Sequence, residues 1–282
     1  MGYTPEQQAF LDEEAKKEAK QNFPQLNPTK ISLVGRNPNK PNPEKAGKFF
    51  SREFILSEKK YGEAKEMAES FEGIILDICY RVDWKYKENQ QTTLKSREFH
   101  DWKEPIELLH FDYTGEKTKV TTKKVFNTYA DLKSAFCGVD EYGVEKNTPY
   151  DLFAVIYLFS PIMGLCKYEA KGMTRSNFFD YQKNWFKAVS ETKTLKNVVT
   201  VFGVEEDEKG FSGTFKPKGL ASPEMMGAIM ETTKTLREWQ EGWKQSRKEE
   251  VKEELPTIQI EEQLADVGLV DKGQVDMSSV PF

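Results

Sequence analysis

The feature of this sequence that most limits its fold is Asp151–Phe159, a stretch in which almost every side chain is apolar. Read as a strand, it divides its apolar side chains between two faces: Leu152, Ala154, Ile156 and Leu158 on one, and Phe153, Val155, Tyr157 and Phe159 on the other. A strand that is apolar on both faces needs cover on both of them. We therefore predict that this segment is the central strand of a covered sheet.

Other segments also have the composition of strands. Branched and aromatic residues are concentrated in Ile31–Gly35, Phe49–Leu56, Gly73–Val82, Val198–Val204 and Phe211–Phe215. In Gly73–Val82, apolar residues at even positions alternate with polar or small ones at odd positions, which indicates a half-buried strand. The last two segments are joined by Glu205–Gly210, which suits a hairpin loop.

Three segments are predicted to be helical. Residues 4–20 begin with a capping pattern, in which Thr4 caps, Pro5 takes the first helical position and Gln7 completes a capping box. Because the faces of this helix are polar, it should form a peripheral arm. A second, short helix is expected at about 174–187, and a long C-terminal helix from Ser222 or Pro223 to about 248 should pack across the body.

Antiparallel strands with an interposed helix are typical of the OB fold. The predicted fold is therefore mainly β with helices: an elaborated, partly open, five-stranded barrel of the OB type with long insertions at about 85–148. The predicted organisation is an N-terminal helical arm at 1–29, the OB-like domain at 30–248, and a disordered acidic tail at 249–282.

Charge is distributed unevenly along the chain. The net charge of −5 combines a tail (249–282) of nine acidic residues and two lysines, net −7, with a body (30–248) of net +4 and an N-terminal segment (1–29) of net −2. A basic body with an acidic tail is compatible with binding to nucleic acid. No apolar run is long enough to span a membrane and the first residues do not resemble a signal peptide, so a soluble, cytoplasmic protein without membrane partners is expected.

The sequence gives little support for catalysis. It contains no phosphate loop, dinucleotide-binding glycine pattern, nucleophile elbow or HExxH motif. His100 and His110 are too sparse to define a metal site, and Cys79, Cys137 and Cys166 lack CxxC spacing, so they are expected to be buried apolar residues. We predict no enzyme activity, metal or cofactor, with a nuclease or another nucleic-acid enzyme kept as an alternative.

Cations and aromatic residues alternate in Lys48–Phe54 and at the end of the strand that follows it. In proteins that bind single strands, cations contact phosphates and aromatic rings stack on bases, each stacked base contributing about 1–3 kcal/mol. The candidate DNA-binding residues here are Lys48, Phe50, Arg52, Arg81, Trp84 and Tyr86. The alternative is that the aromatic side chains fill the core and the cations lie at strand edges.

A second such segment is Lys167–Lys187. At helical spacing, Phe178, Tyr181 and Trp185 form one stripe, which we predict to be core. A different sector combines cations and aromatics, and its candidate DNA-binding residues, together with the preceding lysine, are Lys171, Arg175, Phe179, Lys183, Phe186 and Lys187. A partner-binding face or a contact between the helix and the barrel is the alternative for this sector.

The chain ends in Asp276-Met277-Ser278-Ser279-Val280-Pro281-Phe282. An acidic segment of this kind can insert a terminal aromatic ring in an apolar pocket while a basic rim binds its carboxylates. The plan resembles phage and bacterial single-stranded DNA-binding proteins, which have an OB-type core and an acidic tail that often ends in Pro-Phe. The resemblance implies a partner-binding tip at Asp276, Val280, Pro281 and Phe282. In this chain Val280 stands where Ile is common, and serines replace a usual acidic run.

The body also resembles larger phage members of that family, in which a strand and a glycine-containing turn lead into a polar-aromatic helix, here Leu152–Phe159, Lys171-Gly172 and Thr174–Trp185. The resemblance implies a single-stranded DNA-binding protein without sequence preference. Such a protein acts in DNA replication, recombination and repair, protects single strands, and recruits replication or recombination proteins through its tail. A phage structural or scaffolding protein that self-assembles is the other alternative, and a homo-oligomer stays open.

Overall fold

The computed structural model describes residues 26–34, 46–84, 87–88, 91–112, 119–137, 149–189, 194–208 and 210–253. The chain divides into two compact units, one of residues Leu26–Thr235 and one that combines Met1–Gln25 with Leu236–Phe282. All described strands belong to the first unit. The predicted N-terminal helix and the acidic tail beyond residue 253 lie outside the described residues.

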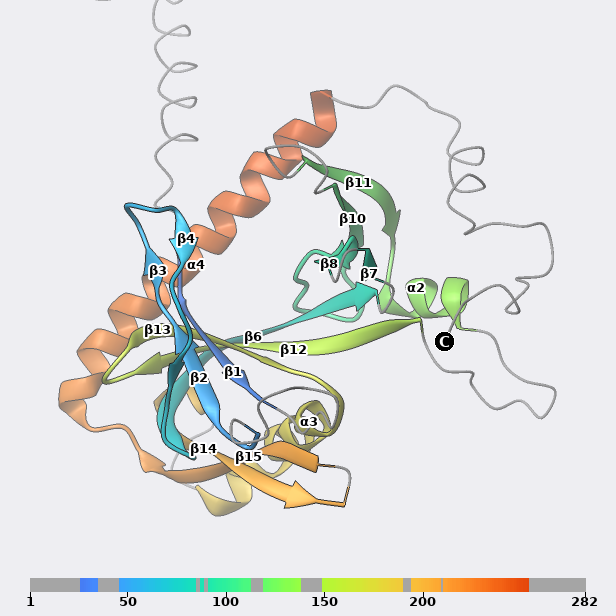
Figure 1. Cartoon of the computed structure of the whole chain (residues 1–282). Coiled ribbons are helices and arrows are strands. Elements are labelled where there is room, and N and C mark those ends of the chain that lie inside the picture. The colour runs from blue at the N-terminus through green and yellow to red at the C-terminus, as the bar shows by residue number, and fades with distance from the viewer. Residues whose placement is uncertain are drawn as a thin grey trace, which may run out of the picture. The chain divides into compact units, whose positions relative to one another are not determined.

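Strands make up most of the first unit (Figure 1). In chain order they are β1 (Thr29–Leu33), β2 (Phe49–Arg52), β3 (Phe54–Ile55), β4 (Lys60–Tyr61), β5 (Lys65–Glu66), β6 (Phe71–Trp84), β7 (Lys87–Glu88), β8 (Gln91–Thr92), β9 (Leu94–Ser96), β10 (Ile106–Asp112), β11 (Lys119–Phe126), β12 (Tyr150–Ser160), β13 (Gly164–Ala170), β14 (Val198–Asp207) and β15 (Gly210–Leu220). The helices are α2 (Tyr129–Phe136), α3 (Gly172–Ala188), the 3-10 turn η2 (Leu195–Asn197) and α4 (Pro223–Glu253). None of the helices in the described ranges is long and apolar enough to cross a membrane.

The sheet is organised around the antiparallel pair β6 and β12, which is in register from Tyr150 opposite Trp84 to Phe159 opposite Ile74. On the far side of β12 follow β13, β1, β2 and β5, with β1 parallel to β13. The other edge of β6 is shared. Its first residues pair with β14, and its last residues pair with β9, which continues into β10 and β11. At 14 residues, β6 is long enough to carry two neighbours on one edge.

The prediction of a mainly β chain with helices is confirmed, and Asp151–Phe159 is the central strand that its sequence indicates. The predicted count of five strands is too low, because the sheet contains eleven. Within the described residues the strand order ends at β11, β5 and β15 without returning on itself, so these strands form no closed barrel. The unpredicted strands include β9–β11, which lie inside the expected insertion. They also include β13, in which Lys167 and Glu169 alternate with buried residues, so that its composition does not indicate a strand.

The core lies on the face of the sheet that carries the even-numbered residues of β12 and those of β6 from Ile78 to Trp84; before the register shift in this pair, the odd-numbered Ile75 of β6 faces the core. Tyr80, Val82, Ala154, Ile156 and Tyr168 are buried there. Helix α3 packs on this face through Phe178, which is fully buried, and Tyr181, which is 6 % exposed, while Trp185 is half-buried against the same core. The predicted core stripe of the helix is therefore confirmed.

Helix α3 lies close to β15, and one glycine makes this approach possible. A Cβ atom at Gly213 would lie 2.7 Å from Thr174 Cγ2, where a side chain has no room. The backbone N–H of Gly213 donates a hydrogen bond of 2.8 Å to Thr174 Oγ1, and its carbonyl accepts one of 3.0 Å from Asn177. These contacts fix the orientation of the helix on the sheet.

Replacing Phe178 by Ala should lower the free energy of unfolding by about 3–5 kcal/mol, because it leaves a cavity where a fully buried ring packs on Phe215. The exposed Ile162, replaced by Ala, is the control and should change stability by less than about 0.5 kcal/mol. Denaturant unfolding of both variants measures the difference. Equal stability of the two would contradict the assignment of α3 to the core.

Candidate nucleic-acid interface

The sheet surface opposite the core carries charged residues at alternate positions, and we call it the charged face. Its members are Lys30 on β1, Arg52 on β2, Arg81 and Asp83 on β6, Lys95 on β9, Glu98 after β9, Tyr157 on β12, and Lys167 and Glu169 on β13. The register places Lys30 directly between Arg52 and Lys167, and Tyr157 opposite Lys167. Residues far apart in the sequence are thereby brought onto one surface.

Five residues of this face form a continuous series of ion pairs, which we call the ionic network: Arg81, Asp83, Glu169, Lys167 and Glu98. The guanidinium of Arg81 donates two hydrogen bonds to Glu169, of 2.7 and 3.0 Å, and two to Asp83. Lys167 Nζ lies 3.3 Å from Glu169 and 2.5 Å from Glu98 Oε1. The other oxygen of Glu98 accepts a 2.8 Å hydrogen bond from the Tyr157 hydroxyl.

The pKa values in this network show which charges are stabilised. Burial would raise the pKa of Glu169, but the attraction of Arg81 and Lys167 outweighs it and lowers that pKa to about 2. In the same way, burial opposes the charged form of Glu98, and Lys167 lowers its pKa nevertheless. The pKa of Lys167 is raised because its two carboxylate partners outweigh the effect of burial. Glu169, Glu98 and Lys167 are therefore charged near neutral pH.

At the other end of the face, three cations follow one another across neighbouring strands. We call Arg52, Lys30 and Lys167 the basic strip. Like charges directly opposite one another on a sheet repel. Lys167 is neutralised by the network, whereas Arg52 and Lys30 are exposed and have no carboxylate within ion-pair distance among the described residues.

Lys30 is the cation of the strip whose pKa is lowered. Burial lowers its pKa, and the nearby charges of Lys167, Arg81 and Lys95 lower it further, against the opposing effect of Glu169. An anion bound at this position would relieve the repulsion between these cations.

An aromatic ring completes the strip. The ammonium of Lys30 lies 3.8 Å from the centroid of the Tyr61 ring, within cation–π distance. Tyr61 is held in place because its hydroxyl donates a 3.2 Å hydrogen bond to the carbonyl of Pro28 and its ring makes an edge contact with Phe54. The strip therefore combines two cations, Arg52 and Lys30, that have no carboxylate partner in the described ranges with a half-buried, oriented ring.

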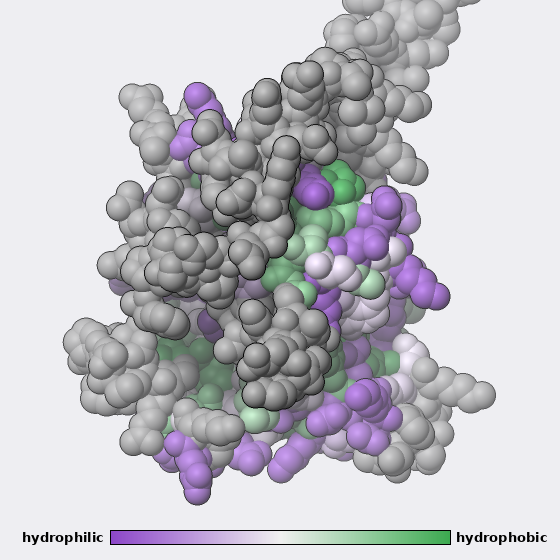
Figure 2. Space-filling view, turned by 90° about the vertical axis from the view of Figure 1, so that its right-hand side faces the viewer, coloured by the Kyte–Doolittle hydropathy of each residue, from purple (hydrophilic) through white to green (hydrophobic). Residues whose placement is uncertain are grey.

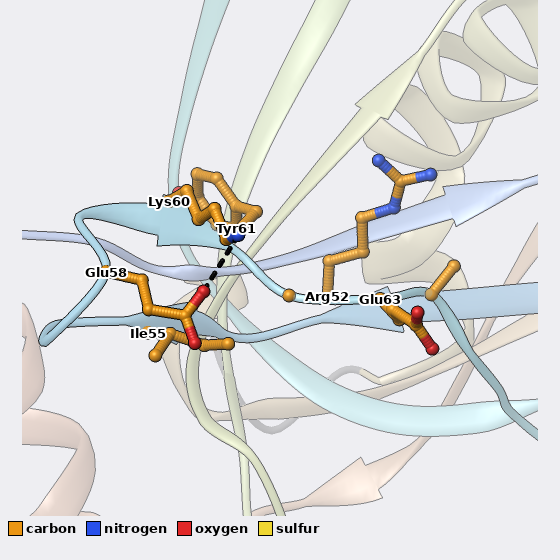
Figure 3. Close-up of a pocket in the computed structure, with 8 residues that line it drawn as sticks. Arg52, Ile55, Glu58, Lys60, Tyr61 and Glu63 are labelled. Carbon is orange, nitrogen blue, oxygen red and sulfur yellow. Dashed lines mark ion pairs between the residues drawn. The ribbon is translucent and has the colours of Figure 1, made fainter.

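Tyr61 and Arg52 also border an open hollow along the short β3–β4 hairpin (Figure 3). The hollow is lined as well by Ile55, Glu58, Lys60 and Glu63. Glu58 forms an ion pair of 2.9 Å with Lys60. The guanidinium of Arg52 points away from both of these side chains (Figure 3). The arginine is therefore available to a ligand at the edge of the strip.

Further cation–aromatic pairs lie along the charged face. The Phe153 ring on β12 has the Arg81 guanidinium 5.1 Å from its centroid and the Lys171 ammonium 5.8 Å from it. Lys95 lies 5.5 Å from the Phe111 ring on β10. Phe153 and Phe111 are half-buried, so part of each ring can contact a ligand.

The first set of predicted DNA-binding residues does not assemble into one site. Lys48 forms an ion pair of 2.6 Å with Glu66, and Arg81 is held by its two carboxylates. Phe50 and Trp84 are 6 % and 8 % exposed, so their rings are not accessible to bases. Arg52 is the exposed member of this set, while Tyr86 lies outside the described residues.

The second set is divided. Lys171 is exposed and lies 3.5 Å from Asp151, and Lys183 is exposed on α3. Arg175 donates a 2.9 Å hydrogen bond to the carbonyl of Leu152 and lies 5.9 Å from the half-buried Phe179 ring. The side chains of Phe186 and Lys187, like the tail residues Asp276, Val280, Pro281 and Phe282, lie outside the part of the chain that the structure describes.

Sequence reasoning missed Lys30, Tyr61, Lys95 and Phe153 as site residues. Lys30 flanks the buried Ile31 in a predicted strand, so alternation could have placed it on the outer face. The position of Tyr61 beside Lys30 depends on the β3–β4 hairpin, which has no strong local pattern. Long-range strand pairing, rather than composition, determines this site.

Within the described ranges, no group of three or more His, Cys, Asp and Glu side chains could hold a metal ion. His100 Nε2 lies 2.8 Å from Asp77 Oδ2, and Cys79, Cys137 and Cys166 are free thiols, two of them buried.

No match was found for the chain in comparisons with protein-family models, curated proteins and solved structures.

The Glu169 pKa leads to a prediction for acid stability. Because the folded pKa of about 2 lies below the ordinary 4.5, the charged form of Glu169 stabilises the fold above pH 4.5, and this contribution is lost as pH falls from 4.5 towards 2. Replacing Glu169 by Gln should cost about 1–3 kcal/mol at pH 7, since a partly exposed network lies between a surface pair and a buried one.

The measurement is denaturant unfolding at several pH values for the native protein and the E169Q variant. The difference between them should shrink between pH 4.5 and 2. Replacing the exposed Glu205 by Gln provides the control and should leave the pH profile unchanged. A constant difference across this pH range would rule out Glu169 as the titrating group.

Proposed function

We propose that this chain binds single-stranded DNA without sequence preference, in replication, recombination or repair. The observation that carries the proposal is the basic strip, in which Arg52 and Lys30 lack carboxylate partners among the described residues and Lys30 lies against the Tyr61 ring. Unpaired cations beside an aromatic ring are the combination that proteins use to bind the backbone and bases of single strands.

In the proposed complex, the phosphates contact Arg52 and Lys30, which offsets the repulsion between the cations of the strip. Tyr61, and further along the charged face Phe153 and Phe111, offer ring surface to the bases. None of these contacts reads a base edge, so binding is independent of sequence. A strand held in this way cannot anneal with its complement.

The ionic network limits where the strand can bind. Arg81 and Lys167 are neutralised by Glu169, Asp83 and Glu98, so they contribute little to phosphate binding. A duplex, with its densely spaced charges and enclosed bases, gains nothing from the aromatic rings. The preference for single strands therefore depends on the rings.

The test is a titration of the full chain with single-stranded and duplex DNA of equal length. Tighter binding to the single strand is expected, and equal affinity would refute the proposal. Replacing both Lys30 and Arg52 by Ala should weaken single-strand binding about tenfold or more at low salt. It should also reduce the slope of log affinity against log salt by about 1.4, since each lost phosphate contact removes about 0.7.

A matched control uses Lys216 on β15 and Lys196 on η2, which are not members of the basic strip. Their double replacement by Ala removes the same charge and should reduce affinity far less. If both double variants lose affinity equally, net charge rather than the basic strip governs binding.

The proposal includes the acidic tail as a recruiting segment for replication or recombination proteins, and an OB-type ancestry for the open sheet. Removing Ser278–Phe282 takes away the proposed anchor Phe282 but none of the nine acidic residues of the tail. Affinity for single-stranded DNA should therefore stay within about twofold, while binding to a purified replication partner is lost. Retention of partner binding by this truncation would exclude the last five residues as the recruiting element.

A further inference from the structure

Trp102 is a large aromatic side chain that stays accessible, with 38 % of its surface exposed. It belongs to the segment between β9 and β10, on the core side of the sheet rather than on the charged face. On the face shown in Figure 2, exposed hydrophobic residues lie next to hydrophilic ones, so partly exposed apolar side chains occur elsewhere on this surface. The exposure of Trp102 still needs a reason, because burying a ring of this size would stabilise the fold.

The ring is held rigidly by other aromatic residues. One of its faces stacks on Tyr80, with ring centroids 4.3 Å apart and an interplanar angle of 27°. It also makes T-shaped contacts with Phe99 and Tyr129, at centroid distances of 5.7 and 5.0 Å. These three aromatic contacts hold the ring of Trp102 in a fixed orientation while 38 % of the residue stays exposed.

The backbone around Trp102 is equally well fixed. The N–H of Tyr129 donates a 3.0 Å hydrogen bond to the Trp102 carbonyl, and the N–H of Lys103 donates one of 2.9 Å to the carboxylate of Asp101. Phe99 exchanges two backbone hydrogen bonds with Tyr80. Little conformational entropy remains to be lost when a ligand stacks on the ring.

The basic face of α3 lies next to this aromatic cluster. Phe179 makes an edge contact with Tyr80 at 5.9 Å, and Gln182 hydrogen-bonds to the Tyr80 hydroxyl. Arg175 and Lys183 lie one turn before and after Phe179, on the same side of the helix. Lys183 is exposed, as is Lys103, which follows Trp102 in the chain, so both cations are accessible to a ligand near this aromatic cluster.

We propose that Trp102 is a base-stacking position for single-stranded nucleic acid, with phosphates of the same strand bound by Lys103 and Lys183. The inference rests on the proposed function and adds a second contact on the opposite side of the sheet from the basic strip. A planar base can stack on the exposed part of a ring that its aromatic neighbours already hold in place. The neighbouring cations favour a polyanionic ligand over an apolar peptide.

The experiment replaces Trp102 by Leu, which preserves apolar packing on Tyr80 but cannot stack on a base. Two ligands of equal length are titrated, a thymidine oligonucleotide and a strand of the same backbone without bases. The variant should bind the thymidine strand about 5- to 100-fold more weakly, corresponding to one lost stacking interaction. It should bind the baseless strand as the native protein does.

The Ile162→Ala variant, which removes a side chain that is 95 % exposed elsewhere, serves as the control, and thermal unfolding checks that all variants are folded. An equal loss on both strands would show that Trp102 acts through the fold, and no loss on either would show that the ring does not contact the strand. Both results overturn this inference. The proposed function fails separately, if the native protein does not prefer single strands or if the variant lacking Lys30 and Arg52 binds normally.

Discussion

The structure depends on the pairing of β6 with β12, two long strands that contribute to both faces of the sheet. Every other described strand of the large sheet attaches to this pair directly or through intervening strands. On one face, the even-numbered residues of β12 and those of β6 from Ile78 to Trp84 form an apolar core with α3. On the other, residues such as Arg81 alternate with them by strand geometry alone, so the same pairing that builds the core also builds the charged face.

Charges this close to buried backbone are stable only when they are paired. Arg81, Glu169, Lys167 and Glu98 pair with one another in a continuous series, which compensates for the loss of hydration. Next to this series, Lys30 is exposed and has no carboxylate within ion-pair distance among the residues that the structure describes. The distinction between the structural cations and the proposed ligand-binding cations of this face is therefore one of pairing rather than of residue type.

Local periodicity was sufficient to predict the elements that depend on local packing. The spacing of Phe178, Tyr181 and Trp185 identified the buried side of α3, and the two apolar faces of Asp151–Phe159 identified the central strand. The site could not be predicted in the same way, because Lys30 and Lys167 are neighbours only through the parallel pairing of β1 with β13. Burial of Phe50 and Trp84 likewise depends on packing partners that sequence spacing does not reveal.

Consecutive residues of β6 connect the two proposed contact surfaces, since Tyr80 supports Trp102 on one face while Arg81 belongs to the charged face on the other. Because the two surfaces lie on opposite faces of the sheet, a nucleic acid that contacts both must pass around an edge of the sheet. Duplex DNA resists bending on this scale, with a persistence length of about 150 base pairs. A single strand turns freely at each nucleotide. If both surfaces bind one ligand, selectivity for single strands follows from the thickness of the sheet as well as from base stacking.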